Sequence, residues 1–230
     1  MKNKVILITG ASKGLGFALA RHWSLQNTVI NISRTKGPNL GPKSYFFQCD
    51  LSKLEEVKTT VLEVIKAFPK IDLVINNAGL FTSSPIVVMG PQDISTMVDV
   101  NLKAPMIISR YLMRKMTQEK SGQIINILSM ASRLNIVGDS VYAATKAGLE
   151  TFSKILNKEG HPCGVHVNNI SISAFPSGML DKLLVGNESK ILNMIPHKQY
   201  APLLEIVKAI EFFEKNHLDL GGQTISFGGI

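Results

Sequence analysis

Thr9-Gly10-Ala11-Ser12-Lys13-Gly14-Leu15-Gly16 follows the apolar run Val5–Thr9 and leads straight into a helical pattern. Where a strand turns through glycines into a helix, free backbone N–H groups and the positive helix end can hold a phosphate group. The residues expected to contact it are Gly10, Ser12, Lys13, Gly14, Leu15 and Gly16. A tight structural turn looks the same, so the loop indicates a dinucleotide site only if further motifs agree with it.

Apolar runs and helical patterns alternate along the rest of the chain. The expected strands are Val5–Thr9, Thr28–Ser33, Tyr45–Cys49, Leu73–Asn76, Gly122–Leu128, Val165–Ile172 and Thr224–Phe227. The expected helices are Leu15–Gln26, Leu54–Ala67, Asp93–Thr117, Ser140–Lys158 and Leu203–Lys215. This alternation predicts an α/β single-domain Rossmann fold over residues 1–230, with a doubly wound, seven-stranded parallel sheet. Thr35–Ser44 is too rich in glycine and proline for a helix, so a loop replaces the crossover helix between strands two and three.

The positive charge of the chain gathers near the glycine loop. The formal net charge is +8, and no acidic residue precedes Asp50. The cations before Asp50 are Lys2, Lys4, Lys13, Arg21, Arg34, Lys36 and Lys43. A solvated basic face is the plain alternative, but the position of the glycine loop favours a bound anion. Nucleic acid is not expected, because aromatic and basic residues are not interleaved.

The remaining composition indicates a cytoplasmic protein without a metal site. No apolar run reaches the length of a membrane span, and the N-terminus runs directly into a strand rather than a signal peptide. Cys49 and Cys163 are expected to be separate thiols, and the histidines show no metal or triad spacing.

The end of the second expected strand favours NADP(H) over NAD(H). A carboxylate at this position would bond the ribose hydroxyls and repel a 2′-phosphate. The sequence instead has Ser33, Arg34 and Thr35 there, and Lys13 projects from the glycine loop. A hydroxyl and two cations can hold a phosphate. The alternative for Arg34 is an ordinary exposed cation.

Further motifs follow in a fixed order. Asp50-Leu51 follows the third strand, Asn76-Asn77-Ala78-Gly79 ends the fourth, Asn101 lies in the long helix, and Tyr142-Ala143-Ala144-Thr145-Lys146 follows Ser129. Ser132 stands at the wrong interval to replace Ser129. From Thr9 to Gly229 the chain resembles the short-chain dehydrogenase/reductase family, of the classical type, and is most similar in general to the 3-oxoacyl-acyl-carrier-protein reductases.

This resemblance implies a role for each motif. Tyr142 would exchange a proton with the substrate, Lys146 would bond the nicotinamide ribose, Ser129 would hold the substrate oxygen, and Asn101 would hold a relay water. The residues implied to bind the cofactor are Asp50, Leu51, Asn77, Ala78, Gly79, Tyr142, Lys146 and Ser177, together with the glycine loop and Ser33, Arg34 and Thr35. Pairing through the long helices would give a homodimer or a homotetramer.

The spacing of Tyr142 and Lys146 agrees with these roles. Four residues apart on a helix, the two side chains share one face at a separation of about 6 Å. We expect the Lys146 ammonium to favour the phenolate and so to lower the pKa of Tyr142 towards neutrality. A core tyrosine on an amphipathic helix is the alternative.

The sequence departs from the family after the sixth strand. Ile172 and Ser173 stand where the family has proline and glycine, and Ser177 takes the position of a hydroxyl that bonds the carboxamide. Leu180–Tyr200 is expected to form the substrate lid. In the carrier-protein reductases, basic residues near the active-site mouth grip an acidic carrier protein. Lys120 occupies one such position, whereas Cys163 stands at the other.

These expectations combine into an NADP(H)-dependent oxidoreductase that moves a hydride between the nicotinamide and a carbonyl or secondary alcohol. A 3-oxoacyl thioester, linked to a carrier protein, is one candidate among the small-molecule substrates. A protein of the same fold that binds NADP(H) as a sensor or scaffold without turnover is the alternative. It is disfavoured because such relatives usually lose the tyrosine or the lysine.

Overall fold

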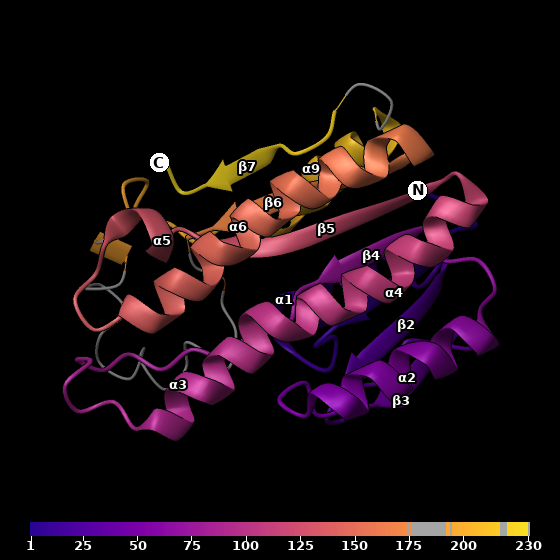
Figure 1. Ribbon diagram of the computed structural model, residues 1–230. Coiled ribbons are helices and arrows are strands. Elements are labelled where there is room, and N and C mark those ends of the chain that lie inside the picture. Colours follow the sequence, from indigo (N-terminus) through magenta and orange to yellow (C-terminus); the bar gives the residue numbers. More distant parts are fainter. Residues whose placement is uncertain (174, 176–191, 194, 217–219, 230) are drawn as a thin grey trace.

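The computed structural model describes residues 1–173, 175, 192–193, 195–216 and 220–229. Its strands are β1 (Val5–Thr9), β2 (Thr28–Ser33), β3 (Ser44–Gln48), β4 (Leu73–Asn76), β5 (Gly122–Ser129), β6 (Val165–Ile172) and β7 (Thr224–Phe227). They form one sheet in the order β3-β2-β1-β4-β5-β6-β7, and every neighbouring pair is parallel. The predicted seven-stranded Rossmann fold is therefore confirmed (Figure 1).

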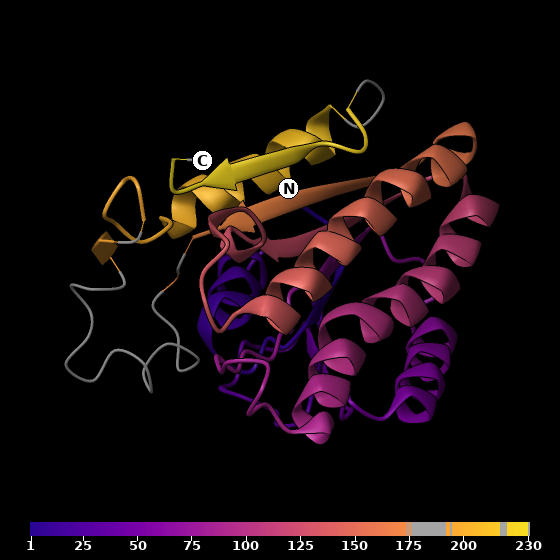
Figure 2. The same cartoon turned by 60° about the vertical axis from the view of Figure 1, so that its left-hand side comes forward.

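Helices cover both faces of this sheet. They are α1 (Gly14–Trp23), α2 (Leu54–Ala67), α3 (Pro91–Val98), the π-helix η1 (Asp99–Lys103), α4 (Ala104–Glu119), α5 (Ala131–Leu134), α6 (Ser140–Gly160), the 3₁₀ helix η2 (His161–Cys163) and α9 (Leu203–Lys215). Helices α2, α4 and α6 cover one face, and α4 and α6 run side by side in the turned view (Figure 2). Helices α1 and α9 pack on each other over the opposite face.

The alternation of side chains along β1 explains the two hydrophobic layers. Leu7 points into the cluster with α2, α4 and α6, whereas Ile6 and Ile8 point into the cluster with α1 and α9. All three side chains are fully buried. A strand buried on both faces requires such a continuous apolar run, which is why this part of the sequence was predictable.

Three local expectations have clear outcomes. No helix forms in residues 34–43, so the predicted loop between β2 and β3 is confirmed. Helix α1 ends earlier than predicted, where the Asn27 amide donates to Trp23 O at 3.0 Å and caps the last turn. The helix predicted over Asp93–Thr117 is found as one continuous segment from Pro91 to Glu119, but it contains the π-helical turn η1, which was not predicted.

The two cysteines are separate thiols, as expected. No helix in the described part of the chain is long and apolar enough to cross a membrane. Within the same residues there is no group of three or more histidine, cysteine or acidic side chains that could hold a metal ion.

Buried amides tie the centre of the sheet to the helices on one face. Asn76 on β4 donates to Asn126 Oδ1 on β5 at 2.8 Å and to Ser109 Oγ on α4 at 3.3 Å. Asn126 in turn donates to Ser153 Oγ on α6 at 2.8 Å. All four side chains are buried, so each bond forms away from competing water. The network therefore fixes α4 and α6 against β4 and β5.

Replacing Asn126 should test this network. Asn126→Leu removes both bonds and leaves buried polar partners behind, so we expect the free energy of unfolding to fall by about 2–4 kcal/mol. Urea denaturation measures the change. Gln118→Leu, an exposed site on α4, should change it by less than about 0.5 kcal/mol. A similar small loss in both variants would contradict the proposed importance of the network.

Candidate active site

A cleft of about 740 Å³ lies at the carboxyl ends of the central strands. Most of the site residues predicted from the sequence line this cleft. They are Gly10, Ser12, Lys13, Gly14, Leu15, Ser33, Arg34, Thr35, Asp50, Leu51, Asn77, Ala78, Gly79, Ser129, Tyr142 and Lys146. This is where parallel α/β sheets bind ligands, because the loops of several strands converge there. Three expected residues remain to be placed: Gly16, Asn101 and Ser177.

The glycine loop has the backbone geometry that its sequence implies. Gly10 and Gly14 have φ of +70° and +58°, in the left-handed region that favours glycine. Gly16 has a different role, since a Cβ there would lie 2.4 Å from Asn77 Nδ2 and 2.5 Å from Gly10 O. Gly16 does not line the cleft. It allows α1 to pack closely against the loop and β4.

Thr9 joins this loop to β4. Its Oγ1 accepts hydrogen bonds from the backbone N–H groups of Asn77 and Ala78, each at 3.0 Å. The Asn77 amide returns a bond to Thr9 O at 2.9 Å. The sequence motifs alone did not single out Thr9 for this function. Its position at the end of β1 was the available signal.

The β2–β3 loop closes one end of the cleft. A Cβ on Gly37 would lie 2.7 Å from Ser12 Cα, so the loop lies directly against the glycine loop. Ser33 donates to Thr35 O at 2.8 Å, which shapes the turn that carries Arg34. Burial acts to raise the pKa of Asp50, but hydrogen bonds from Ser52 and the Arg34 charge leave it below its usual value.

Ser129, Tyr142 and Lys146 converge at the other end of the cleft. The Ser129 hydroxyl lies close enough to Tyr142 to act on its pKa. Lys146 is only 4% exposed, and its Nζ donates to Ile127 O at 2.9 Å. The same Nζ lies 5.9 Å from the centre of the Tyr142 ring, and that ring also makes an edge-to-face contact with Phe81, with the ring centres 4.8 Å apart.

The electrostatics differ from the sequence-based expectation. Burial raises the pKa of Tyr142, the nearby Ser129 hydroxyl lowers it in part, and the charge of Asp139 raises it further. The pKa of Tyr142 is thus above its usual value, and the predicted lowering by Lys146 is not found. Burial also lowers the pKa of Lys146, to about 8. The lysine therefore loses its proton more readily, and a neutral lysine does not stabilise the phenolate form of Tyr142.

Asn101 lies beside the cleft rather than in its lining. Its side chain is fully buried in η1, where Oδ1 accepts from Leu80 N at 2.7 Å and Nδ2 donates to Leu80 O at 2.8 Å. A third contact reaches Thr145 Oγ1 at 3.3 Å. The amide therefore positions the strand-four loop against α6. Any relay water on Asn101 would have to use its backbone carbonyl.

Asp139 is a cleft residue that the sequence analysis missed. It stands immediately before α6, where an acidic residue is usually explained as a helix cap. The structure shows no side-chain capping bond at this position. Asp139 instead lines the cleft and is 5% exposed, and the nearby Ser83 side chain lowers the pKa of its carboxyl in part.

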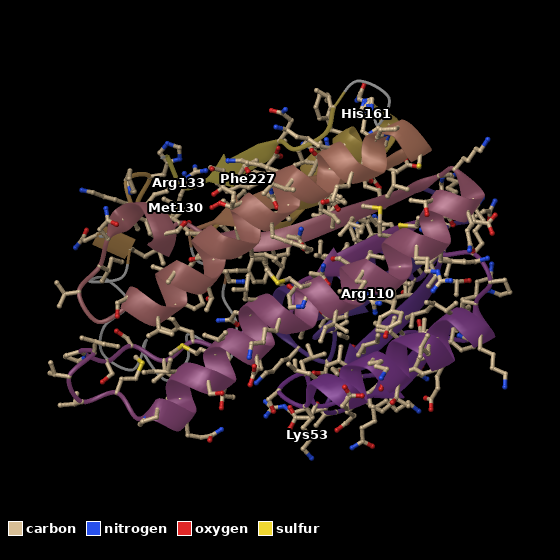
Figure 3. The ribbon with its side chains drawn as sticks, in the orientation of Figure 1. Lys53, Arg110, Met130, Arg133, His161 and Phe227 are labelled. Atoms are coloured by element: carbon tan, nitrogen blue, oxygen red, sulfur yellow. The ribbon has the colours of Figure 1, made fainter. Side chains whose placement is uncertain are left out.

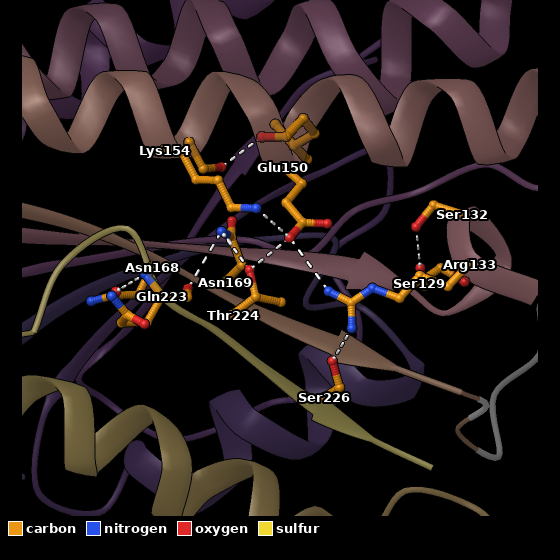
Figure 4. A network of polar contacts seen from close by, with 12 residues as sticks. Ser129, Ser132, Arg133, Glu150, Lys154, Asn168, Asn169, Gln223, Thr224 and Ser226 are labelled. Atoms are coloured by element: carbon orange, nitrogen blue, oxygen red, sulfur yellow. Dashed lines mark hydrogen bonds and ion pairs between the residues drawn. The ribbon is translucent and has the colours of Figure 1, made fainter. Parts of the chain in front are cut away.

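The short helix after Ser129 is anchored from two directions. Arg133 donates to Ser226 Oγ on β7 at 2.7 Å and pairs with Glu150 on α6 at 3.4 Å (Figure 4). Glu150 also accepts from Thr224 at 3.1 Å. Met130 and Arg133 lie beside Phe227, at the end of β7 (Figure 3). Strand β7 and helix α6 thus hold the segment that follows Ser129.

The departure after the sixth strand is accommodated locally. Ile172 and Ser173 line the cleft, and a Cβ on Gly228 would lie 2.6 Å from Ser173 Cβ. Gly228, with φ of +126°, therefore makes room for the serine. Ser177 and most of the expected lid over residues 180–200 lie outside the described residues. Ile195, from that segment, lines the cleft.

Lys120 does not lie near the mouth of the cleft within one chain. It precedes β5, whose other end carries Ser129, and eight strand residues separate those ends by about 25 Å. Cys163 precedes β6 at the same far end, because a Cβ on Gly164 would contact Lys120 O. The expectation that Lys120 sits beside the active-site mouth is therefore wrong for the single chain.

Comparison with known proteins agrees with this geometry. The family model for short chain dehydrogenase matches residues 4–187. The chain belongs to the short-chain dehydrogenase family. It is thus an oxidoreductase that uses a nicotinamide cofactor, and the resemblance stated from its motifs is confirmed.

Relatives match the chain over nearly its full length. It is 33% identical to the 3-oxoacyl-[acyl-carrier-protein] reductase of Buchnera aphidicola, over 98% of this chain and 96% of the relative. It is 31% identical to nodulation protein G of a Rhizobium species, over 97% and 94%. A 3-ketoacyl-(acyl-carrier-protein) reductase from Brucella melitensis, solved with NADH, shares the fold with a TM-score of 0.90, 22% identity and coverage of 99% and 98%.

The buried ammonium of Lys146 makes a stability prediction. A folded pKa of about 8 lies below the ordinary value of 10.5, so the unfolded chain binds this proton more tightly. The buried charge therefore costs stability below pH 8, and this cost is relieved as the pH rises from 8 to 10.5. Lys146→Met should raise the free energy of unfolding by roughly 2 kcal/mol at pH 7, after subtracting the lost bond to Ile127.

Denaturation at pH 7 and pH 10 measures this effect, and the difference between variant and parent should shrink at the higher pH. Lys158→Met, an exposed site on the same helix, should change stability little at either pH. A Lys146→Met protein that is less stable than its parent at pH 7 would refute the inferred cost of the charge.

Proposed function

We propose that this protein reduces a carbonyl group with NADPH, using Tyr142 as the proton donor, Ser129 as the group that holds the carbonyl oxygen and Lys146 as the residue that bonds the ribose. The meeting of Ser129, Tyr142 and Lys146 on the wall of a cleft large enough for cofactor and substrate carries this proposal. When bound, the nicotinamide cofactor supplies the hydride.

The protein's own groups suit the reductive direction. The raised pKa keeps Tyr142 protonated at neutral pH, so its hydroxyl can donate to the oxygen as negative charge builds there. The Ser129 hydroxyl stabilises the same charge by a second hydrogen bond. Lys146, with a pKa of about 8 and its Nζ 5.9 Å from the Tyr142 ring, holds a proton near the tyrosine that would have to be reprotonated after each turnover. Alcohol oxidation would need Tyr142 as a base and is favoured only at higher pH.

Removing the Tyr142 hydroxyl tests the proposed chemistry. Tyr142→Phe should lower kcat/KM for carbonyl reduction by about 10²- to 10⁴-fold, the usual contribution of a positioned proton donor. NADPH binding, followed by fluorescence titration, should stay within a few-fold of the parent. Tyr111→Phe, on α4 outside the cleft, is the matched control and should keep full activity. Binding of NADPH without turnover by the parent protein would favour the sensor alternative.

We propose NADP(H) as the cofactor because of the charges at one end of the cleft. Arg34 and Lys13 both line it and are exposed there, and Ser33 and Thr35 add hydroxyl groups. Asp50 is the nearby carboxylate, but its Oδ1 accepts two bonds from Ser52, at 3.1 and 2.8 Å. The Ser33–Thr35 turn itself offers no acid to repel a 2′-phosphate.

Reversing the charge at Arg34 tests this choice. Arg34→Asp should lower the ratio of kcat/KM with NADPH to that with NADH by about 100-fold or more, because a phosphate contact is replaced by repulsion. Lys66→Asp, an equal charge change on the exposed side of α2, should leave the ratio unchanged. An unaltered ratio in Arg34→Asp would exclude Arg34 from phosphate recognition.

The relatives suggest a 3-oxoacyl thioester as one candidate substrate. A grip on an acidic carrier protein by Lys120 would require a second copy of the chain, because that residue lies at the far end of its own sheet. We also propose a homo-oligomer formed through α4 and α6. The outer faces of these helices form a hollow lined by Met106, Arg110, Met113, Arg114, Phe152, Leu156 and Glu159.

A further inference from the structure

The Asp139 carboxyl has an unused hydrogen-bond acceptor inside the cleft. The side chain is 5% exposed, and within the described residues its Oδ1 has no hydrogen-bond partner. The exposed Ser83 hydroxyl lies close enough to lower the pKa of this carboxyl in part. Buried polar atoms are almost always paired, so a free carboxylate oxygen calls for a functional explanation.

The fold does not supply that explanation. Asp139 occupies the N-cap position of α6, yet its side chain makes no capping bond. Its backbone alone serves the helix, since Asp139 O accepts from Ala143 N at 2.8 Å. Burial raises the pKa of the carboxyl, which means that the site is unfavourable for its charge. No lysine or arginine in the described part of the chain forms an ion pair with it.

Asp139 also lies close to the reacting end of the cleft. It precedes Tyr142 by three residues, at the N-cap of the helix that carries Tyr142, and both side chains line the cleft. Side chains three apart on a helix are about 5–6 Å apart, which is the scale of neighbouring substituents on a small ketone. The same cleft is also lined by the apolar side chains of Phe81, Leu134 and Ile136.

We propose that Asp139 is a specificity determinant that accepts a hydrogen bond from a substrate hydroxyl, carried one or two carbons from the reacting carbonyl. This inference rests on the proposed carbonyl reduction and narrows its substrate class to hydroxy ketones. A hydroxyl suits the site better than an ammonium group, because Lys146 already places a buried cation on this wall. The exposed Ser83 hydroxyl already acts on this carboxyl, so a hydroxyl is a chemically suitable partner for it.

The proposal separates this chain from reductases of simple acyl chains. The alkyl carbons beside the carbonyl of an aliphatic 3-oxoacyl thioester carry no hydroxyl, so they would leave the buried Asp139 oxygen unpaired. A site built to bond a substrate hydroxyl rejects analogues that lack it far more strongly than an apolar pocket rejects one methylene. Asp139 should therefore bias the cleft against such substrates.

The test compares ketone pairs that differ by a hydroxyl in place of a methyl group. Hydroxyacetone with 2-butanone, and 2-hydroxycyclohexanone with 2-methylcyclohexanone, are suitable, with an acetoacetyl thioester alongside. The parent enzyme should prefer the hydroxy ketone by about 100-fold or more in kcat/KM, and Asp139→Leu should reduce this preference to below about 10-fold. Using the ratio within a pair cancels any change in the acidity of Tyr142.

Controls separate misfolding and general effects from specificity. Asp139→Asn keeps the size and one acceptor oxygen and should show an intermediate preference, while Asp93→Leu, an exposed site on α3, should match the parent. NADPH titration and thermal melting verify that each variant is folded. If Asp139→Leu does not fold, the Asp139→Asn ratio decides: a preference equal to that of the parent overturns the proposal.

The outcomes distinguish this inference from the proposed function. If the parent enzyme reduces plain ketones or the thioester as well as hydroxy ketones, or if Asp139→Leu keeps the parent's preference, Asp139 has no role in specificity and the proposed reduction still stands. If the parent reduces no carbonyl at all while binding NADPH, the proposed function fails and this inference fails with it.

Discussion

The buried bonds of Asn126 are the interaction on which the rest of the structure depends. Asn126 links β5 to β4 through Asn76 and to α6 through Ser153. Strand β5 ends in Ser129, and α6 carries Tyr142 and Lys146. An amide has a fixed shape and directional donors and acceptors, so it determines how far α6 can slide along the strand. Apolar packing alone would hold the helix on the sheet with much less control over its register.

This control matters because the reacting groups come from separate elements. Tyr142 and Ser129 stay close only while the helix and the strand end keep their register, and the Lys146 bond to Ile127 O has the same requirement. The buried Lys146 ammonium lowers the free energy of unfolding, and the packing of the sheet against its helices must offset this loss. A stable Rossmann core thus supports a site that is itself unfavourable, which is common for functional residues.

Much of the fold could be predicted because its signals are local. The apolar runs of β1, β2, β4, β6 and β7 gave correct strand bounds. The glycines and prolines after Arg34 correctly predicted a loop, rather than a helix, between β2 and β3. The π-helical turn η1 was not predictable, because one extra residue in a turn barely changes the hydrophobic pattern around Asn101.

The candidate site was predicted in part for a similar reason. The sequence motifs identified Ser129, Tyr142 and Lys146 as candidate catalytic residues, and the structure brings these three together in one cleft. Their pKa values depend on burial and on neighbours distant in sequence, so the raised pKa of Tyr142 could not be derived from helical spacing. Asp139 was hidden because an acid before a helix is usually a cap. The place of Lys120 could have been inferred, since it precedes rather than follows its strand.

The anchoring of α5 also affects when the active site can form during synthesis of the chain. Ser129 and Tyr142 leave the ribosome well before Thr224 and Ser226, yet Arg133 and Glu150 find their partners on those two residues of β7. Domains generally fold as units, and here the strand that secures the segment next to Ser129 is synthesised 93 residues after Arg133. A nascent chain that has made every reacting group still lacks the strand that holds one of them in place.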